Sequence, residues 1–433
     1  MKRKVAFKTL GCRLNQFETD ALVTDFYGAG YEIVTFTDKA DVYIINTCTV
    51  TNQSDQRSKY TFNQAVRNAH SDSVIVITGC MAESGKEFFE NNQNVTYLVD
   101  NLRKGSVLQL IESHFHGKML HPEDLKQDLF NFSLIEKGFH TRSTIKIQDG
   151  CDNFCSYCIV PSVRGPATSR PKKDILENIR KSVDIGNKEI VLTGVNISRY
   201  NYNGISFEDL LEEIIDLPGD FRVRISSIEP EGFTDKLISL FKNPKLCPHL
   251  HLCLQSGSDN ILKQMQRFYT VDQFLNLVGK FRNRFSDFNF TTDIIIGFPG
   301  ETEDDFLETC NVIKQVGFSH IHTFKYSKRN GTRAESMNNQ VPEKIKNERS
   351  IIIRQLSDEN KLIYRRSFIG KEQTVLIEKR SANKPSKGYG EHYLPIQIKN
   401  TFPSQNTFCK VRIIDVLNDK EKSVVGEIIT ESG

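Results

Sequence analysis

The sequence predicts an α/β fold in three parts: an N-terminal doubly wound parallel sheet, a central partial β/α barrel, and a small C-terminal antiparallel β-barrel. Three observations support this fold class. Strand and helix patterns alternate near the N-terminus, a second alternation begins at residue 144, and patterns of period two fill the end of the chain. With 433 residues, the chain is long enough for several domains with separate cores.

The first domain is predicted over residues 1–120. Its strand patterns are KVAFKTL (4–10), DVYIINT (41–47) and SVIVITG (73–79), and helix patterns cover 15–30 and 54–70. A cysteine lies at or just after the end of each strand, at Cys12, Cys48 and Cys80. Because the ligand crevice of an open parallel sheet lies beyond the carboxyl ends of its strands, we expect these three thiols to converge on one site.

The central domain is predicted over residues 144–366, after a segment at 115–143 that lacks a clear period and is expected to be a linker. Strand and helix patterns alternate six times, which predicts an incomplete β/α barrel. The strands are expected at 144–150, 189–195, 222–228, 249–256, 291–298 and 320–327. A long polar helix at 342–366 is expected to leave the barrel.

The terminal domain is predicted over residues 370–433. Its segments QTVLIEKR, YLPIQIK, FCKVRIIDVL and SVVGEIIT alternate with period two and are separated by Gly, Pro, Asn and Ser. This pattern predicts a small antiparallel barrel. Between residues 365 and 400 there are eight Lys or Arg against three Glu, so the start of this domain is basic.

The composition of the whole chain narrows the class of protein. The formal net charge of +3 is too small to indicate nucleic-acid binding by itself, because the distribution of charge matters more than its sum. No signal peptide and no apolar run of about 18 residues is visible, so we expect no membrane association and a cytoplasmic location. In that reducing setting, the ten cysteines favour metal binding or catalysis over disulfides.

The segment CDNFCSYC carries Cys151, Cys155 and Cys158 directly after the first barrel strand. The loops at this end of the strands form the active sites of β/α barrels. Three thiolates with the spacing C-x3-C-x2-C can bind three irons of a [4Fe–4S] cluster, which normally takes four cysteines. The fourth iron is then open to a substrate or a cofactor.

Zinc and simple burial are the alternatives for these three thiols. Structural zinc needs four protein ligands, usually in paired motifs, and the following segment IVPSVRGPATSRP contains neither Cys nor His. Buried thiols without a metal would require this spacing to arise by chance at the mouth of a barrel. The pattern therefore favours the iron–sulfur cluster over both alternatives.

The CDNFCSYC motif resembles the cysteine motif of radical S-adenosylmethionine enzymes. In that family, the open iron binds the amino and carboxylate groups of S-adenosylmethionine, and reduction cleaves this cofactor to a 5′-deoxyadenosyl radical. The resemblance implies that Cys151, Cys155 and Cys158 hold the catalytic cluster.

Further cofactor-binding residues are expected at four positions. Tyr157 matches an aromatic position whose backbone lies beside the adenine in the family, and Gly194 and Asn196 fall on a strand that contacts the cofactor in relatives. Glu229 ends the third barrel strand, so it is expected to face the same mouth.

The N-terminal cysteines make the resemblance more specific. A triad at Cys12, Cys48 and Cys80 ahead of such a barrel resembles the tRNA methylthiotransferase family, whose N-terminal domain carries a second [4Fe–4S] cluster. The motifs that agree are KTLGCRLNQFE, INTCTVT, TGCMAE, RISSIEP, LQSGSD, DIIIGFPGETEDDF and YSKRNGTRA. The terminal barrel resembles the family's TRAM domain, a small RNA-binding barrel. The resemblance thus implies two [4Fe–4S] clusters, S-adenosylmethionine, and a tRNA substrate.

The segments CSYCIVPSVRG and GVNISRY most resemble the branch that methylthiolates C2 of N6-threonylcarbamoyladenosine at position 37, in the anticodon loop of tRNA. The branch that acts on N6-isopentenyladenosine is the alternative within the family. A non-catalytic RNA-binding protein that holds zinc at the same cysteines is the alternative from another class. The enzymatic interpretation also implies a reducing electron donor and a sulfur donor.

RNA contacts are expected from basic residues beside the mouth of the barrel. Arg164 and Arg170 follow the cysteine loop, and Lys328, Arg329 and Arg333 follow the sixth strand. A run of charges is often only a solvated surface. Because both runs border one expected active site, we predict that they bind the phosphates of the RNA.

Overall fold

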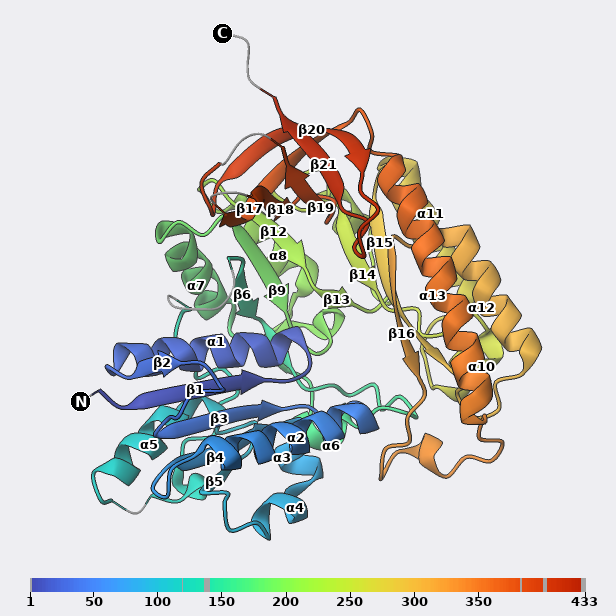
Figure 1. The fold of residues 1–433 in the computed structure, drawn as a ribbon. Coiled ribbons are helices and arrows are strands. Elements are labelled where there is room, and N and C mark those ends of the chain that lie inside the picture. Colours follow the sequence, from blue (N-terminus) through green and yellow to red (C-terminus); the bar gives the residue numbers. More distant parts are fainter. Residues whose placement is uncertain (1, 119, 136–140, 382–383, 400–402, 430–433) are drawn as a thin grey trace.

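The computed structural model describes residues 2–118, 120–135, 141–381, 384–399 and 403–429. Figure 1 shows an N-terminal α/β unit, a partial barrel beside it, and a small β-barrel at the end of the partial barrel that lies away from the N-terminal unit. No helix in the described ranges is both long and apolar enough to cross a membrane.

The N-terminal unit is a parallel sheet with helices on both faces. Its elements are β1 (Lys4–Thr9), α1 (Arg13–Gly28), β2 (Glu32–Val34), β3 (Val42–Thr47), α2 (Asn52–Asn68), β4 (Val74–Gly79), α3 (Cys80–Ser84), α4 (Lys86–Glu90), β5 (Tyr97–Val99) and α5 (Val107–Phe115). The strand order is β2-β1-β3-β4-β5, and every pair is parallel. The predicted doubly wound sheet is confirmed, with the short edge strands β2 and β5 in addition.

Alternate residues of these strands belong to different cores. Val42 and Ile44 pack with residues of α1 and α5, whereas Tyr43 and Ile45 pack with residues of α2, α3 and α4. This alternation follows from the pleat of a strand, which points successive side chains to opposite faces. Burial on both faces explains why the strands are almost continuously apolar in sequence.

The central unit is an open barrel of parallel strands with helices on its outer side (Figure 1). Its elements are β6 (Ser143–Lys146), β7 (Gln148–Asp149), α6 (Val160–Arg164), β8 (Thr168–Ser169), α7 (Lys172–Asp184), β9 (Glu189–Thr193), β10 (Asn201–Tyr202), β11 (Ile205–Ser206), α8 (Phe207–Asp216), β12 (Arg222–Ile225), β13 (Ser227–Ile228), α9 (Asp235–Leu240), β14 (His249–Leu252), α10 (Asp259–Gln264), α11 (Val271–Arg284), β15 (Asn289–Ile296), α12 (Glu303–Val316), β16 (His320–Lys325) and α13 (Glu343–Arg366). Strands β6, β9 and β12 form one parallel sheet, and β13 to β16 form the other. Because β13 follows β12 after one residue, the two sheets make the predicted six-unit wall.

Helix α13 does not leave the barrel, contrary to the expectation from its polar sequence. The backbone N–H of Ile321 in β16 donates a hydrogen bond to the Ser357 hydroxyl at 3.1 Å, and the Asn360 amide donates to the carbonyl of Ile313 in α12 at 3.1 Å. Ile353 is fully buried in the barrel core. The helix therefore covers the outer face of β16 and completes the wall.

The terminal unit is a closed five-stranded barrel made of β17 (Glu372–Ser381), β18 (Lys384–Tyr389), β19 (Pro395–Ile398), β20 (Phe408–Val416) and β21 (Val424–Ile428). The sequence predicts an antiparallel barrel, but the pair β19–β21 is parallel. A ring with an odd number of strands cannot alternate in direction everywhere, so one neighbouring pair must be parallel.

The N-terminal unit and the barrel meet around a buried cluster of charges. The carboxylate of Glu18 in α1 pairs with Lys104 of its own unit, and with Lys146 and Arg164 of the barrel at 3.1 Å each. Asp149 pairs with the same two barrel cations, at 2.5 and 2.9 Å. All five side chains are at most 2% exposed. We call these five residues the interface charge cluster.

A second buried carboxylate docks the terminal barrel. Glu189, the first residue of β9, pairs with Arg222 at 2.6 Å and with Arg224 at 2.7 Å, both on β12. The two guanidinium groups also donate to backbone carbonyls of the terminal barrel, at Thr374 and Gly390. The terminal barrel therefore sits at the end of the central barrel opposite to the cysteine loop.

The interface charge cluster predicts a pH-dependent stability. Burial alone would raise the pKa of Glu18, but Arg164, Lys104 and Lys146 hold it well below its usual range. A lowered folded-state pKa means that the carboxylate stabilises the fold fully above its unfolded pKa, and that this contribution is lost as the pH falls through the folded pKa. Glu18→Gln leaves three buried cations with one carboxylate, so it should lower the free energy of unfolding by about 3–5 kcal/mol at pH 7.

Denaturant unfolding of the iron-loaded protein measures this effect. The gap between wild type and Glu18→Gln should shrink below about pH 4, where the Glu18 carboxyl of the unfolded chain protonates while that of the folded protein is still ionised. Glu90→Gln is the matched control, because Glu90 forms only an exposed pair with Lys86. Equal stability of the two variants at pH 7 would contradict the assignment.

Candidate functional site

The loop with Cys151, Cys155 and Cys158 connects β7 to α6 at the carboxyl ends of the barrel strands. Gly150 makes the turn into it with a φ of +69°, and a Cβ there would lie 2.0 Å from the carbonyl oxygen of Pro166. Burial and the neighbouring thiols Cys155 and Cys151 raise the pKa of Cys158 to about 12. The three thiols thus share one short loop, and a bound cation would favour their thiolate forms.

Backbone contacts hold this loop from two sides. The backbone N–H of Ser156 donates to the carbonyl of Met265 at 3.0 Å, and its own carbonyl accepts from the N–H of Ala334 at 2.8 Å. The Tyr157 ring packs edge-on against Phe298, with ring centroids 6.5 Å apart. The ring of Tyr157 is thus directed into the protein, away from the solvent side of the cysteine loop to which its backbone belongs.

Arg267 contacts the cysteine loop and was not expected from the sequence. Its guanidinium donates to the Cys155 sulfur at 3.3 Å and pairs with Glu229, and it is nearly buried. The Arg267 side chain therefore links Glu229 to Cys155, and Glu229 lies at the barrel mouth, where the sequence places it. Arg267 is more than a hundred residues from Cys155 in the chain, and no motif marks it.

The segment LTGVN lies directly beside Cys151. The Asn196 side-chain amide is 3.9 Å from the Cys151 sulfur, and its backbone N–H donates to the Gln148 side chain at 2.8 Å. A Cβ at Gly194 would lie 3.0 Å from the Gln148 carbonyl oxygen. The close approach at Gly194 thus brings Asn196 to the thiols.

The three N-terminal cysteines lie together at one edge of the parallel sheet. Cys12, Cys48 and Cys80 follow β1, β3 and β4, whose carboxyl ends are adjacent. Gly11 has a φ of +94°, and a Cβ there would lie 2.7 Å from the Cys48 sulfur. Burial, with Cys80 and Cys12 nearby, raises the pKa of Cys48 to about 11. The topology thus makes a second set of three thiols.

The two cysteine triads lie on elements that touch. Cys80 forms a small buried cluster with Ile159 and Val163, which closely follow Cys158 in the chain. Burial raises the pKa of Cys80, and the Arg164 guanidinium beside it opposes that rise. The segment from Cys158 to Arg164 therefore begins at one triad and ends at the other.

The charges around the N-terminal triad suit an anionic group. The interface charge cluster contains three cations and two carboxylates, which leaves one positive charge in excess. Arg164 and Lys104, which belong to this cluster, lie beside Cys80. Three thiolates that hold an iron–sulfur cluster bring more negative charge than its core neutralises, so the excess cation fits such a group.

Two of the basic residues expected to bind RNA have other roles. Arg164 is 2% exposed on its side chain and is part of the interface charge cluster. Arg170 is buried, and its guanidinium donates to the carbonyl of Lys146. Both guanidinium groups are buried and already paired, that of Arg164 with carboxylates and that of Arg170 with a backbone carbonyl, so neither faces the solvent, where a phosphate would bind. The sequence located these residues near the mouth but could not tell which way they point.

The basic segment after β16 divides in the same way. Arg329 is buried, pairs with Asp55 at 2.6 Å and donates to the carbonyl of Thr49, one residue after Cys48. It therefore joins the barrel to the N-terminal unit. Lys328 and Arg333 are not buried, since their side chains are partly open to solvent. These two remain available for a phosphate.

Two family models match the chain. The model described as "Radical SAM superfamily" matches residues 145–313, and the one described as "Uncharacterized protein family UPF0004" matches residues 4–100. The first covers most of the barrel, including its three-cysteine loop, and the second covers the sheet with the N-terminal triad.

Curated relatives match over nearly the whole chain. The threonylcarbamoyladenosine tRNA methylthiotransferase MtaB of Bacillus subtilis is 36% identical over 424 residues, which cover 95% of this chain and 93% of the relative. The enzyme of the same name from Thermotoga maritima is 37% identical and covers 90% of each chain. The tRNA-2-methylthio-N(6)-dimethylallyladenosine synthase of Fusobacterium nucleatum is 37% identical, over 87% of this chain and 88% of the relative.

A solved structure shares the fold. The radical S-adenosylmethionine methyltransferase TsrM of Kitasatospora setae, with cobalamin and a [4Fe–4S] cluster bound, superimposes with a TM-score of 0.57. It is 14% identical in sequence, and the match covers 77% of each chain. This likeness concerns the arrangement of sheet and barrel.

Proposed function

Because the chain belongs to the family of radical S-adenosylmethionine tRNA methylthiotransferases, we propose that it replaces the C2 hydrogen of N6-threonylcarbamoyladenosine at position 37 of tRNA with a methylthio group. The four relatives of that name cover 86–97% of this chain. The isopentenyladenosine branch is the second candidate, since a relative named as a dimethylallyladenosine synthase is 37% identical over 387 residues.

The observation that carries this proposal is the contact of Cys80 with Ile159 and Val163, which closely follow Cys158 in the chain. An aromatic C–H bond is too strong for acid–base chemistry, so its replacement by sulfur needs both a radical and a sulfur source at the same carbon. The segment between Cys158 and Arg164 touches both triads. One adenosine at this interface would therefore be within reach of both.

The barrel triad would hold the cluster that binds S-adenosylmethionine, which supplies a 5′-deoxyadenosyl radical when the cofactor is bound and reduced. Asn196 and Gly194 border Cys151, and Glu229 is held beside Cys155 by Arg267. These groups would orient the amino acid end of the cofactor. The backbone of Tyr157 would adjoin its adenine.

The N-terminal triad would hold the second [4Fe–4S] cluster and present the sulfur. The buried thiols of Cys48 and Cys80 and the neighbouring excess cation support this assignment. Turnover would need a reducing electron donor and a sulfur donor. We place the activity in the cytoplasm, where tRNA and reduced cysteines occur together.

The RNA would contact solvent-accessible cations of two units. Lys328 and Arg333 are exposed, and Arg333 precedes Ala334, whose backbone N–H donates to Ser156 of the cysteine loop. Lys379 and Lys387 lie directly opposite each other on β17 and β18. Like charges at directly opposed positions destabilise a sheet pair, so such an arrangement is useful where a phosphate neutralises it. These four residues are our candidates for the RNA-binding surface.

Nucleoside mass spectrometry of tRNA from cells with and without the gene tests the function. Loss of the methylthio group from threonylcarbamoyladenosine, restored by wild type but not by Cys155→Ala, is the expected result. Loss from isopentenyladenosine instead would identify the other branch. No change in either nucleoside, with zinc and no iron in the colourless purified protein, would favour the zinc-containing RNA-binding protein.

Cys48→Ala separates the two triads. It removes one ligand of the N-terminal set only, so the reconstituted protein should keep about four of about eight irons. It should still form 5′-deoxyadenosine from S-adenosylmethionine, but it should yield no methylthio product. Iron analysis and chromatography of both products measure this, with Cys409→Ala as the control because Cys409 lies on β20 of the terminal barrel. Methylthio product at the wild-type level would disprove the sulfur-presenting role.

Salt dependence tests the RNA-binding surface. Removing one side chain that binds a phosphate should reduce the slope of log K against log salt by about 0.7–0.9. Lys328→Ala/Arg333→Ala should therefore lower the slope for tRNA by about 1.4–1.8 if each side chain meets one phosphate. Lys280→Ala/Lys314→Ala is the matched control, because these lysines lie on the outer helices α11 and α12. An unchanged slope in the first variant would exclude these two residues from the surface.

A further inference from the structure

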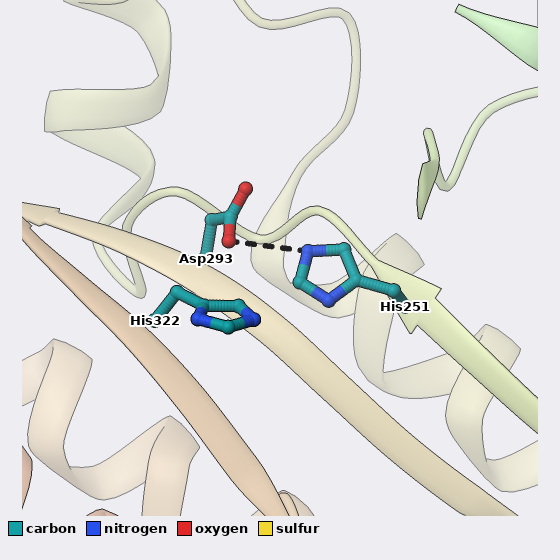
Figure 2. A group of neighbouring side chains, drawn as sticks. All are labelled: His251, Asp293 and His322. Atoms are coloured by element: carbon teal, nitrogen blue, oxygen red, sulfur yellow. Dashed lines mark ion pairs between the residues drawn. The ribbon is translucent and has the colours of Figure 1, made fainter. Parts of the chain in front are cut away.

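Two histidines and an aspartate face each other on the inner side of the barrel wall, apart from both cysteine triads. Figure 2 shows His251 on β14, Asp293 on β15 and His322 on β16, with their side chains directed toward one another. Asp293 lies in the middle of β15.

The pleat of the strands explains why these three side chains share one face. Leu250, Leu252, Ile294 and Ile321 pack in the core between the strands and the outer helices. Residues one position away must point to the opposite, inner face. Asp293 and His322 are direct partners in the parallel pairing of β15 with β16.

The geometry of the trio is compatible with a metal-binding site. His251 Nε2 and Asp293 Oδ1 are 3.2 Å apart, and one ligand atom from each of the three residues lies within 4.8 Å of the others. Two adjacent ligands at about 2.0–2.2 Å from one ion are roughly 3.0–3.5 Å apart, which matches the first distance. His322 is exposed and Asp293 is 25% exposed on its side chain, so an ion could enter and the His322 ring has room to turn.

A neighbouring hydroxyl supports His251 in this role. The Thr291 Oγ lies 3.0 Å from Nδ1 of His251 and 3.1 Å from Nε2 of His249. A histidine that binds a metal through one ring nitrogen usually donates its other N–H to an oxygen, which fixes its tautomer. With the proton on Nδ1 and donated to Thr291, the lone pair of Nε2 would face the Asp293 carboxylate. In that tautomer, a cation between the two acceptors would satisfy both of them.

We propose that His251, Asp293 and His322 bind one divalent transition-metal ion, separate from the iron–sulfur sites. Two imidazoles and one carboxylate on one side of an ion suit Fe²⁺ or Mn²⁺ and leave further coordination positions open to oxygen ligands. Those positions face the inner side of the barrel. Within the described part of the chain, no other group of His, Cys, Asp or Glu side chains is this compact. The proposal does not depend on the methylthiolation reaction.

Mn²⁺ titration of the iron-loaded wild-type protein tests this site. Mn²⁺ is chosen because thiolates select softer metals, so it should not compete for the cysteines. Electron paramagnetic resonance at room temperature follows aqueous Mn²⁺, whose signal disappears on binding. Wild type should bind one Mn²⁺ per chain, and His322→Ala and Asp293→Asn should each weaken binding at least about tenfold.

His320→Ala is the matched control, because His320 lies on the same strand with its ring 4.5 Å from that of His322 and outside the ligand group. It should bind Mn²⁺ as wild type does. Because His322 is exposed, its replacement removes a ligand without emptying the core, and unchanged iron content in each variant verifies folding. No binding by wild type, or equal binding by His322→Ala, Asp293→Asn and wild type, would overturn the proposal.

Discussion

The ion pairs of Glu18 with cations from two units are the constraint on which the rest of the site depends. Glu18 belongs to the N-terminal sheet, and Lys146 and Arg164 belong to the barrel, so their pairing exists only when the two units are docked. Breaking a buried pair by removing one partner is costly, because the remaining charge has no water to solvate it. The free energy needed to break these pairs therefore opposes separation of the N-terminal unit from the barrel. The pairing also fixes the segment from Cys158 to Arg164 against Cys80, and through it the relation between the two triads.

That relation has a chemical meaning. A radical generated at one metal centre and a sulfur atom held at another must meet the same substrate carbon, and small misplacements of reacting groups reduce rates strongly. The central barrel supplies one triad on a loop anchored by Met265 and Ala334, and the N-terminal sheet supplies the other at its strand ends. The terminal barrel docks at the opposite end through Glu189, Arg222 and Arg224. It thus leaves the cysteine loop uncovered, and a long substrate could contact both ends of the molecule.

Much of this arrangement follows from the sequence, because it depends on local patterns. Strand periodicity and the position of Cys12, Cys48 and Cys80 after three strands were enough to place three thiols at one sheet edge. The roles of Arg164 and Arg329 were not accessible in the same way, since a basic residue looks alike in sequence whether it faces a phosphate or a buried carboxylate. Arg267 and the trio of His251, Asp293 and His322 come together only through the pairing of distant strands and loops. Contacts between residues so far apart in the chain produce no periodicity or motif spacing that sequence analysis could detect.

The spatial relation of the two clusters is the central claim, and low-temperature electron paramagnetic resonance of the reduced protein tests it most directly. Two paramagnetic clusters held on touching elements should interact, so the wild-type spectrum should be broadened or split relative to the sum of the spectra of Cys48→Ala and Cys155→Ala. Each of these variants retains one intact triad and reports one cluster alone. A wild-type spectrum that equals this sum, with unchanged relaxation, would show that the clusters are far apart and would contradict the account.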